Sequence, residues 1–284
     1  MPIKQYRVFY DSPGQMCNRF WSYIDSVAWA IENNSKIIVL FWDKSIRDFT
    51  RLRHNQYITF PLYSKLMIRL IGESRYIQLL KRVLTNRYAR MLYRLFLRNF
   101  VQALKAYDLH NNHNYYPHHL EEIRHLFLPN IEHRIDIDEA FESFHHANYT
   151  IVGIHIRRGD YKNWRKGQFY YSHEEYTGFM KQTQKALKGK EIIFYISTNE
   201  NIPNSILQSQ LPICNILSKS AAMDLYALSQ CDLIIGPPSS FSRWASLMGH
   251  VPIYQIWDKN KQITLHSFSP LRYLDEREDG LRYI

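Results

Sequence analysis

The chain has 284 residues, of which 45% are hydrophobic and 15% aromatic, enough to bury one large domain or two of moderate size. Its formal net charge of +10 favours anionic partners such as nucleic acid, a phosphate-bearing substrate or an acidic membrane surface. Three cysteines without a C-x-x-C pair argue against a disulfide framework and fit a reducing compartment, and we see neither a signal peptide nor a membrane-spanning run of about 20 apolar residues.

The first elements in chain order predict a βαβ unit. Residues 5–10 are typical of a strand, 11–14 of a turn, and 15–34 of an amphipathic helix, because apolar side chains recur there at helical spacing. The continuous apolar run at 36–42 predicts a strand covered on both faces. Strand, turn, helix and strand within about 40 residues indicate a parallel pair joined by a crossover helix.

Residues 50–128 have a different pattern, which predicts a helical insert in the first domain. Between residues 61 and 100, Leu, Ile, Tyr and Phe interleave with nine cations that are set against Glu73 alone. The cations are Lys65, Arg69, Arg75, Lys81, Arg82, Arg87, Arg90, Arg94 and Arg98. One interpretation is a basic amphipathic helix pair that lies on a membrane or a polyanion. The interpretation that we favour is an insertion with a solvated basic face.

The βαβ pattern resumes after residue 148. The apolar runs 149–156, 191–197, 232–236 and 251–257 predict strands, and helical patterns occupy 172–189, 221–230 and 241–249 between them. Ser172 and Glu175 stand at capping-box spacing at the start of the first of these helices. We therefore predict an α/β protein of two parallel-sheet domains, 1–148 and 149–284, with the ligand at the carboxyl ends of the strands.

The stretch IHIRRGDY carries the strongest chemical signal. Arg157 and Arg158 follow a buried strand directly, and a guanidinium there presents a fork that matches phosphate oxygens. Gly159 permits a tight turn, and Asp160 could neutralise the second arginine or act on a substrate hydroxyl. The alternative is a strand end with solvated arginines that pair with surface carboxylates.

Two other stretches that follow predicted strands give weaker indications of a ligand site. In IIGPPSSFSRW, Ser239 and Ser240 stand at the start of a helix, where hydroxyls and backbone N–H groups bind anions, although ordinary N-capping by serine is common. In DSPGQMCNRF, Gly14 is the only glycine, so neither a dinucleotide fingerprint nor a P-loop is present. Asn18 and Arg19 in the next helical turns could face a cleft, or Asn18 could be a local cap.

These three stretches together resemble the fucosyltransferases. HIRRGDY is similar to the H-x-R-R-G-D-Y element of the bacterial α-1,2-fucosyltransferases and, more loosely, to the H-x-R element of α-1,6- and protein O-fucosyltransferases. GQMCNRFWSYIDSVAWAI and DLYALSQCDLIIGPPSSFSRWASLMG resemble the family's amino-terminal and carboxyl-terminal elements, and the likeness covers 6–42 and 151–257. Arg19 and Arg243 replace the family's neutral glutamine and tryptophan, which leaves acceptor, linkage and donor sugar open.

The resemblance implies two Rossmann-like domains in a GT-B arrangement. The first domain, with its helical insert, would face the acceptor, and the second would bind GDP-fucose. Arg157 would contact the diphosphate, and Arg158 would hold the phosphate or the loop. His155 would touch the nucleotide or be structural, and Asp224 would take a nucleotide-side or structural position. The remaining residues that match the family's elements are Ser239, Ser240 and Phe241 beside the diphosphate, and Gly14, Asn18 and Arg19 on the cleft side.

The implied reaction is an inverting, metal-independent transfer of fucose to a glycan hydroxyl. We expect an α-1,2 linkage and a role in bacterial surface polysaccharide synthesis, with a glycan or lipid-linked acceptor and no nucleic acid partner. The general base is not singled out: Asp160 is the first candidate and Asp11 the second. We expect the enzyme in the cytoplasm, with peripheral attachment to an anionic membrane surface on the inner face as an option.

Two observations bear on metals and on alternatives. The sequence DID at 136–138 matches a metal signature, but Asp138 is typical of a helix cap, and we expect the histidines at 110–119 and 145–146 to be structural or exposed. The alternatives that stay open are the same fold with another linkage or donor sugar, and a non-catalytic protein that binds RNA or another polyanion.

Overall fold

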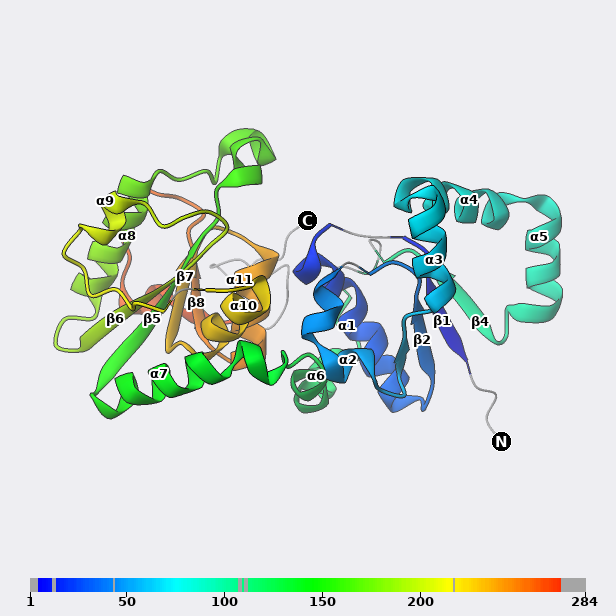
Figure 1. Ribbon diagram of the computed structural model, residues 1–284, viewed down its shortest axis with the longest axis horizontal. Helices are drawn as coiled ribbons and strands as arrows, with labels where there is room; N and C mark the ends of the chain where they lie inside the picture. Colours follow the sequence, from blue (N-terminus) through cyan, green and yellow to red (C-terminus); the bar gives the residue numbers. More distant parts are fainter. Residues whose placement is uncertain are drawn as a thin grey trace. The chain divides into compact units, whose positions relative to one another are not determined.

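The protein divides into two compact units, Met1–Leu128 and Pro129–Ile284, each built on its own sheet (Figure 1). The structure is a computed structural model that describes residues 5–11, 14–42, 44–106, 109, 112–216 and 218–271. The boundary falls before helix α7 (Ile135–His146), whereas we expected it at 148. The reason is that α7 packs on strand β5 of the second unit and on its helix α10.

The first unit contains a four-stranded parallel sheet in the order β3-β2-β1-β4. Its strands are β1 Tyr6–Phe9, β2 Lys36–Val39, β3 Ile58–Thr59 and β4 Val101–Leu104. Its helices are α1 Met16–Glu32, α2 Thr50–Arg53, α3 Leu62–Ile71, α4 Glu73–Thr85, α5 Arg87–Leu92 and α6 Leu120–Leu126, and a π-helical turn, η2 Tyr93–Leu97, follows α5. The predicted βαβ unit is confirmed as β1, α1 and β2; residues 12–13 of the predicted turn lie outside the described residues.

Helix α1 is buried almost all round, because the sheet covers one side and the segment 115–127 the other. Phe20 packs edge-on against Phe127, with ring centroids 5.0 Å apart. Asp25, a buried carboxylate in the middle of the helix, accepts hydrogen bonds from the backbone N–H groups of Tyr115 and Tyr116 at 2.6 and 3.2 Å. These bonds replace the water that a buried carboxylate loses, so they fix the segment to the helix.

The expectation of a purely helical insert over 50–128 is wrong. β4 pairs in parallel with β1, with Tyr6 opposite Val101, and β3 pairs with β2, so both ends of this segment belong to the sheet. The helices α3, α4 and α5 lie between these two strands in the chain. The strand Val101–Leu104 has four residues and follows a long helical pattern directly, so periodicity alone did not separate it.

The second unit contains a five-stranded sheet in the order β6-β5-β7-β8-β9. β9 is antiparallel to β8, and the other strands run parallel. The strands are β5 Tyr149–Ile156, β6 Glu191–Thr198, β7 Leu233–Gly236, β8 Pro252–Gln255 and β9 Ser269–Pro270. Besides α7, the helices are α8 His173–Ala186, α9 Asn204–Leu207, α10 Ala221–Gln230 and α11 Ser240–Gly249, and the predicted capping box of α8 is present.

Strand β5 is buried on both faces, as its continuous apolar sequence predicts. Ile154 and Ile156 belong to a core with Phe179 of α8. Gly153 lies on the other face, where an added Cβ would stand 2.7 Å from the Leu228 side chain of α10. α10 therefore packs directly on the strand backbone, and His155, two residues further along, shares its face of the sheet.

Two general properties complete the description. The three cysteines are buried and free. Among the described residues, no helix combines the length and the apolar character that crossing a bilayer requires.

Candidate functional site

The candidate site lies at the carboxyl edge of the second unit's sheet. β5, β6 and β7 run parallel, so the residues that follow them meet at one edge: 157–160, 199–200 and 237–239. Gly159 has φ +36°, and an added Cβ would lie 2.8 Å from Nδ2 of Asn199. Glycine is therefore needed for the turn that follows the two arginines.

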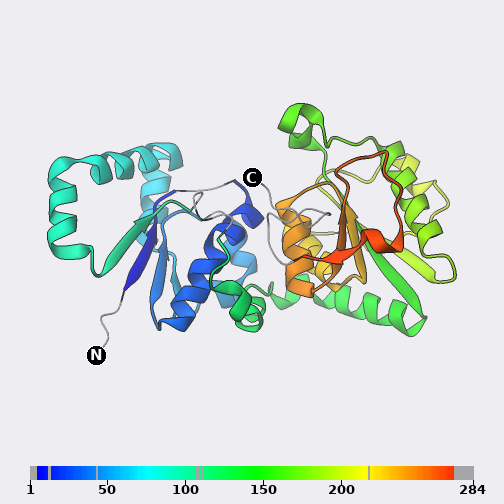
Figure 2. The ribbon, with the colours of Figure 1, turned by 180° about the vertical axis from the view of Figure 1, so that it is seen from behind.

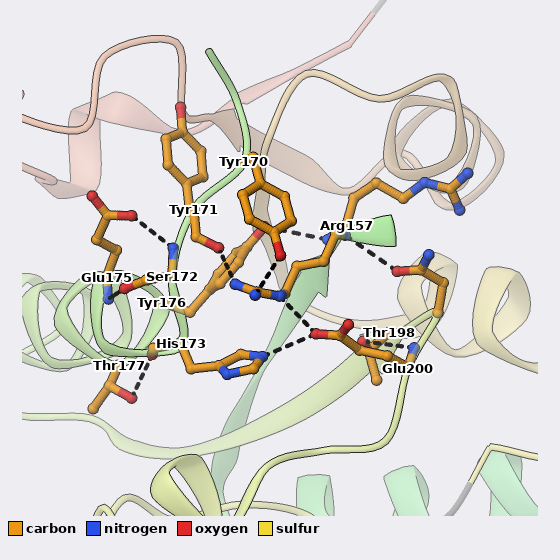
Figure 3. Close-up of polar contacts among 12 residues, drawn as sticks. Arg157, Tyr170, Tyr171, Ser172, His173, Glu175, Tyr176, Thr177, Thr198 and Glu200 are labelled. Carbon is orange, nitrogen blue, oxygen red and sulfur yellow. Dashed lines mark hydrogen bonds and ion pairs between the residues drawn. The ribbon is translucent and has the colours of Figure 1, made fainter. Parts of the chain in front are cut away.

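Arg157 forms a forked ion pair with Asp160 within this turn. Nε lies 3.0 Å from Oδ1, and NH2 donates to Oδ2 at 3.0 Å. The backbone N–H of Arg157 donates to the Tyr176 hydroxyl at 3.2 Å, which ties the strand end to α8. The arginine side chain is 18% exposed and extends away from the cluster around Tyr170 and Glu200 (Figure 3).

The guanidinium of Arg158 contacts several residues of the second unit. Its NH1 donates to the Tyr171 carbonyl at 2.7 Å and its NH2 to the Tyr170 hydroxyl at 2.6 Å. The guanidinium carbon stands 4.4 Å from the Tyr170 ring centroid, and Nε lies 2.8 Å from Glu200, which also contacts His173 at 2.9 Å. Figure 3 shows Tyr170 and His173 close to Glu200, with the contact between His173 and Glu200 drawn as a dashed line. Of its two expected roles, this arrangement favours holding the loop.

His155 lies beneath the arginine turn and is neutral. The residue is 3% exposed, and burial, reinforced by the charge of Arg157, lowers the pKa of His155 to about 3. Its ring lies 5.3 Å from that of Phe241, and its buried Nδ1 makes no hydrogen bond within the described part of the chain. The histidine therefore supports the strand end as a neutral ring and supplies no charge.

The amino terminus of α11 stands beside the arginine turn. Ser239 caps this helix by accepting a hydrogen bond from the backbone N–H of Phe241 at 3.2 Å, and Ser240 is the first helical residue. The Tyr161 hydroxyl donates to the carbonyl of Pro238 at 2.6 Å, and burial raises the pKa of Tyr161 to about 12. The tyrosine thus joins the turn to the helix, and the positive end of the helix dipole adds to the arginine charges.

Asp224 is part of a buried polar cluster under β6. It accepts a hydrogen bond from the Tyr195 hydroxyl at 2.7 Å. Burial raises the pKa of Asp224 to about 6, against the opposing effect of hydrogen bonds from Tyr195, Ser218 and Ser197. Of the two roles expected for Asp224, this environment favours the structural one.

The remaining cleft-side residues come together in the first unit. Gly14 has φ +46°, Arg19 Nε donates to its carbonyl at 3.3 Å, and Asn18 stands so close that a Cβ on Gly14 would lie 2.3 Å from Nδ2. Arg19 also lies 3.9 Å from Glu73. Asp11, the second candidate base, accepts from the backbone N–H of Ala106 at 2.5 Å and so joins the ends of β1 and β4.

The expected cap at Asp138 is wrong. α7 begins at Ile135, so Asp138 lies in the first turn, where it accepts from the Tyr226 hydroxyl at 2.6 Å. Its neighbour Asp136 pairs with Lys219. Across the described residues, no three His, Cys, Asp or Glu side chains gather as a metal site would require.

Three of the histidines singled out in the sequence have local partners, and His118 is exposed. His119 pairs with Glu32 at 3.4 Å, His145 with Asp232 at 3.2 Å, and His146 with Glu142 at 3.6 Å. Residue 110 lies outside the described residues. The described members thus take the structural or exposed roles expected of them.

Sequence reasoning missed three side chains that organise the turn. Tyr161 is part of the motif HIRRGDY but received no role, although the hydroxyl of a buried tyrosine usually has a hydrogen-bond partner. Glu200 follows the end of β6, so the same strand-end rule that selected Arg157 would have selected it. Tyr170 carried no signal, because its contact depends on how the loop 163–172 folds back.

Comparison with known families decides the relationship. A sequence profile of glycosyl transferase family 11 matches residues 61–262, well over half of the chain. The chain belongs to glycosyl transferase family 11. This confirms the resemblance inferred from the sequence. The family 11 match includes HIRRGDY and the 234–244 element, and it also spans most of the basic segment, for which the sequence alone gave no counterpart.

Solved fucosyltransferases share the fold of this family 11 chain. The fucosyltransferase NodZ from Bradyrhizobium is 16% identical with a TM-score of 0.52, over 89% of this chain and 95% of that one. NodZ α-1,6-fucosyltransferase soaked with GDP-fucose is 14% identical with a TM-score of 0.51, over 89% and 94%. POFUT1 in complex with GDP-fucose is 10% identical with a TM-score of 0.54, over 87% and 94%. At these identities the likeness establishes the fold. The comparison with curated proteins found no significant match.

Proposed function

We propose that this family 11 glycosyltransferase moves fucose from GDP-fucose to a glycan hydroxyl with inversion, forming an α-1,2 linkage in bacterial surface polysaccharide synthesis. Family membership supports glycosyl transfer, and the H-x-R-R-G-D-Y stretch supports the donor and linkage. POFUT1, described in complex with GDP-fucose, and NodZ, described as soaked with GDP-fucose, share the fold, and this supports the same donor. The acceptor in this proposal is a glycan or a lipid-linked oligosaccharide.

The observation that carries the proposal is the position of Arg157. Arg157 follows a strand at the carboxyl edge of a parallel sheet, and its guanidinium carbon lies 5.9 Å from the ring centroid of Tyr161. The Tyr161 hydroxyl in turn donates to the carbonyl of Pro238, just before the ten-residue helix α11. The departing GDP gains negative charge as the glycosidic bond breaks, so a fixed cation stabilises the transition state more than the ground state. The helix dipole acts in the same direction. Both features belong to one unit, so the diphosphate is proposed to bind to the second unit.

Arg157 would also take the role that a divalent cation takes in other glycosyltransferases. A guanidinium carries five N–H donors and a permanent positive charge, and the ion pair with Asp160 engages two of the five. We therefore propose that transfer needs no metal. Addition of a chelator should leave the rate unchanged, and restoration of a lost rate by Mg²⁺ or Mn²⁺ would contradict this part of the proposal.

Nucleotide binding tests the donor before any acceptor is known. A ligand that binds only the folded protein raises its melting temperature, so GDP should raise it and UDP and CMP should not. Arg157→Ala should remove the shift, while the matched exposed variant Lys181→Gln on α8 should keep it. A shift with UDP alone, or an unchanged GDP shift in Arg157→Ala, would overturn the assignment.

Product analysis tests the transfer and its linkage. With GDP-fucose and a panel of galactose-terminated oligosaccharides, we expect a fucosylated product whose methylation pattern shows substitution at the 2-hydroxyl. Arg157→Ala should lower kcat/KM by about 100-fold or more, as removal of a single transition-state donor does elsewhere. A 6-linked product would support fucosyl transfer but contradict the α-1,2 linkage. The 6-linkage is the linkage type of the NodZ α-1,6-fucosyltransferase, which shares the fold.

A further inference from the structure

The first unit exposes an unusual surface between β3 and β4 in the chain. We call it the insert face and define it by the exposed apolar and basic side chains between Leu62 and Phe100 on α3, α4, α5 and η2. Both views show α4 and α5 projecting beyond β1 and β2 of the same unit (Figures 1 and 2). The proposed glycosyl transfer gives this surface no role.

Exposed large apolar side chains concentrate on the insert face. Of 18 such side chains in the described part of the chain, 13 lie between residues 62 and 100. They are Leu62, Tyr63, Leu66, Leu70, Leu79, Val83, Tyr88, Met91, Leu92, Leu95, Phe96, Leu97 and Phe100. Single exposed apolar residues are ordinary on protein surfaces, but a concentration of this kind marks an interaction site.

The helices of the insert face have apolar residues on two sides. On the inner side, Met67, Ile68 and Ile77 pack against a core formed by Phe41 and Tyr76. On the outer side of α3, Leu62, Leu66 and Leu70 recur at every fourth residue and form a second, exposed row. α5 and η2 have no buried residue at all. The inner row thus attaches α3 and α4 to the unit, and the outer row stays exposed.

The insert face also carries most of the excess charge of the protein. Nine exposed cations, the set named in the sequence analysis, stand with one carboxylate, Glu73, between residues 61 and 100. Their net charge of +8 compares with +10 for the whole chain. Glu73 lies next to Arg19, and no carboxylate of the described residues forms an ion pair with any of the nine. The charge is therefore available to an external anionic surface.

We propose that the insert face binds the surface of an anionic lipid bilayer, with α3, α4, α5 and η2 lying in the headgroup region. Rows of Leu and Phe beside Lys and Arg are what such a position requires, because the apolar side chains enter the acyl boundary while the cations contact phosphate groups. Each cation near an anionic surface strengthens binding by about fivefold.

Other occupants fit the insert face less well. RNA or another soluble polyanion would use the cations but would leave the apolar rows in water. A second copy of the chain would cover the apolar rows but would bring two surfaces of the same +8 charge together. Anionic lipid satisfies both properties. The inference concerns binding alone, so it does not depend on the proposed donor or linkage.

Vesicle co-sedimentation with the full chain tests the proposal directly. We expect binding to vesicles of phosphatidylcholine mixed with phosphatidylglycerol, weak binding to pure phosphatidylcholine, and release as the salt concentration screens the charges. Equal binding to both vesicle types, or no binding to the anionic ones, would overturn the proposal. A stable dimer in light scattering that binds no vesicle would assign the face to a second copy and would also overturn it.

Variants with matched controls locate the contact. The triple variant Arg90→Gln/Arg94→Gln/Arg98→Gln should weaken binding to anionic vesicles about 100-fold. Lys181→Gln/Lys185→Gln/Lys188→Gln removes the same charge from exposed positions on or just after α8 and should bind like the wild type. Equal losses in both variants would show that net charge alone drives binding, which contradicts the proposal.

A second pair of variants tests the apolar row. Leu95 and Phe96 are each 67% exposed, so Leu95→Ser/Phe96→Ser should fold normally and lose vesicle affinity by about tenfold or more. Leu207→Ser/Leu265→Ser, at exposed positions of the second unit, is the control that should bind normally. Leu62→Ser/Leu66→Ser on α3 repeats the test should the first pair not fold. Unchanged binding in a folded variant of the insert face would refute the lipid contact.

Discussion

Arg157 and Asp160 form a two-point ion pair at the end of β5, with Nε 3.0 Å from Oδ1 and NH2 3.0 Å from Oδ2. Both carboxylate oxygens therefore face the arginine that we propose to bind the diphosphate. Each oxygen keeps a second lone pair, but a proton on either of them would remove the negative charge that pairs with Arg157. The geometry fits better with a carboxylate that orients Arg157.

Asp160→Asn separates the orienting role from that of a general base. An orienting Asp160 predicts a modest loss of kcat/KM, about tenfold, with the acidic limb of the pH–rate profile preserved. The melting temperature should barely change, because an ion pair with a 54% exposed carboxylate contributes at most about 1 kcal/mol. Loss of the acidic limb together with a far larger drop in kcat would identify Asp160 as the base instead.

Arg158 should matter for stability more than for nucleotide contact. Arg158→Gln would remove the donor to the Tyr171 carbonyl and the cation beside Glu200, which would keep only its contact with His173. This should cost about 2 kcal/mol of the free energy of unfolding. This corresponds to a fall in melting temperature of about 4–8 °C. Calorimetry checks the value, with Lys181→Gln as the exposed control. Normal stability combined with a lost GDP shift would show that Arg158 binds the nucleotide.

The sequence predicted the second unit closely, because its elements repeat one pattern. Strand 149–156 and helix 221–230 were predicted with the bounds that the structure has, because the strand is a continuous apolar run and the helix begins directly after its capping residue, Ser220. β4 was missed because it has only four residues and follows a helical run, so its alternating strand pattern is too short to be recognised. Its position depends on pairing with β1, which is about 90 residues earlier and invisible to local pattern.

The sequence also predicted which strand end carries the chemistry, but not which arginine has which partners. Arg157 and Arg158 are adjacent and chemically identical, so pattern alone treats them as a pair. The fold separates them, because the loop with Tyr170 and Tyr171 closes over Arg158 while Arg157 extends away from it. Which residues approach from a returning loop is decided by tertiary packing, and no local spacing encodes it.

His155 should make the second unit lose stability in mild acid. Its pKa is about 3 in the folded protein against 6.5 when unfolded, so below pH 6.5 the unfolded chain binds a proton that the folded one does not. Stability therefore rises with pH between about 3 and 6.5, by about 1.4 kcal/mol per unit for this group.

Urea denaturation of His155→Gln at two pH values checks this. Between pH 6.5 and pH 5 the wild type should lose about 2 kcal/mol more than the variant does. His146→Gln, at a position where the side chain is 79% exposed, should behave like the wild type. An identical pH dependence in His155→Gln would mean that the histidine is not held neutral.

Variants of Asp224 test whether its carboxylate, which accepts a hydrogen bond from Tyr195 under β6, is structural. The pKa of Asp224 is raised to about 6, so its protonated form favours folding, and this contribution is lost as pH rises from about 4 through 6. Asp224→Asn keeps an acceptor for the Tyr195 hydroxyl without a buried charge, so the variant should equal or exceed the wild type in stability at pH 7.5. Asp224→Ala leaves a cavity and an unpaired hydroxyl, and it should lose about 2–4 kcal/mol of the free energy of unfolding.

GDP should still raise the melting temperature of both variants, because neither change removes a proposed nucleotide contact. A stable Asp224→Asn protein that no longer responds to GDP would instead place this carboxylate in contact with the nucleotide.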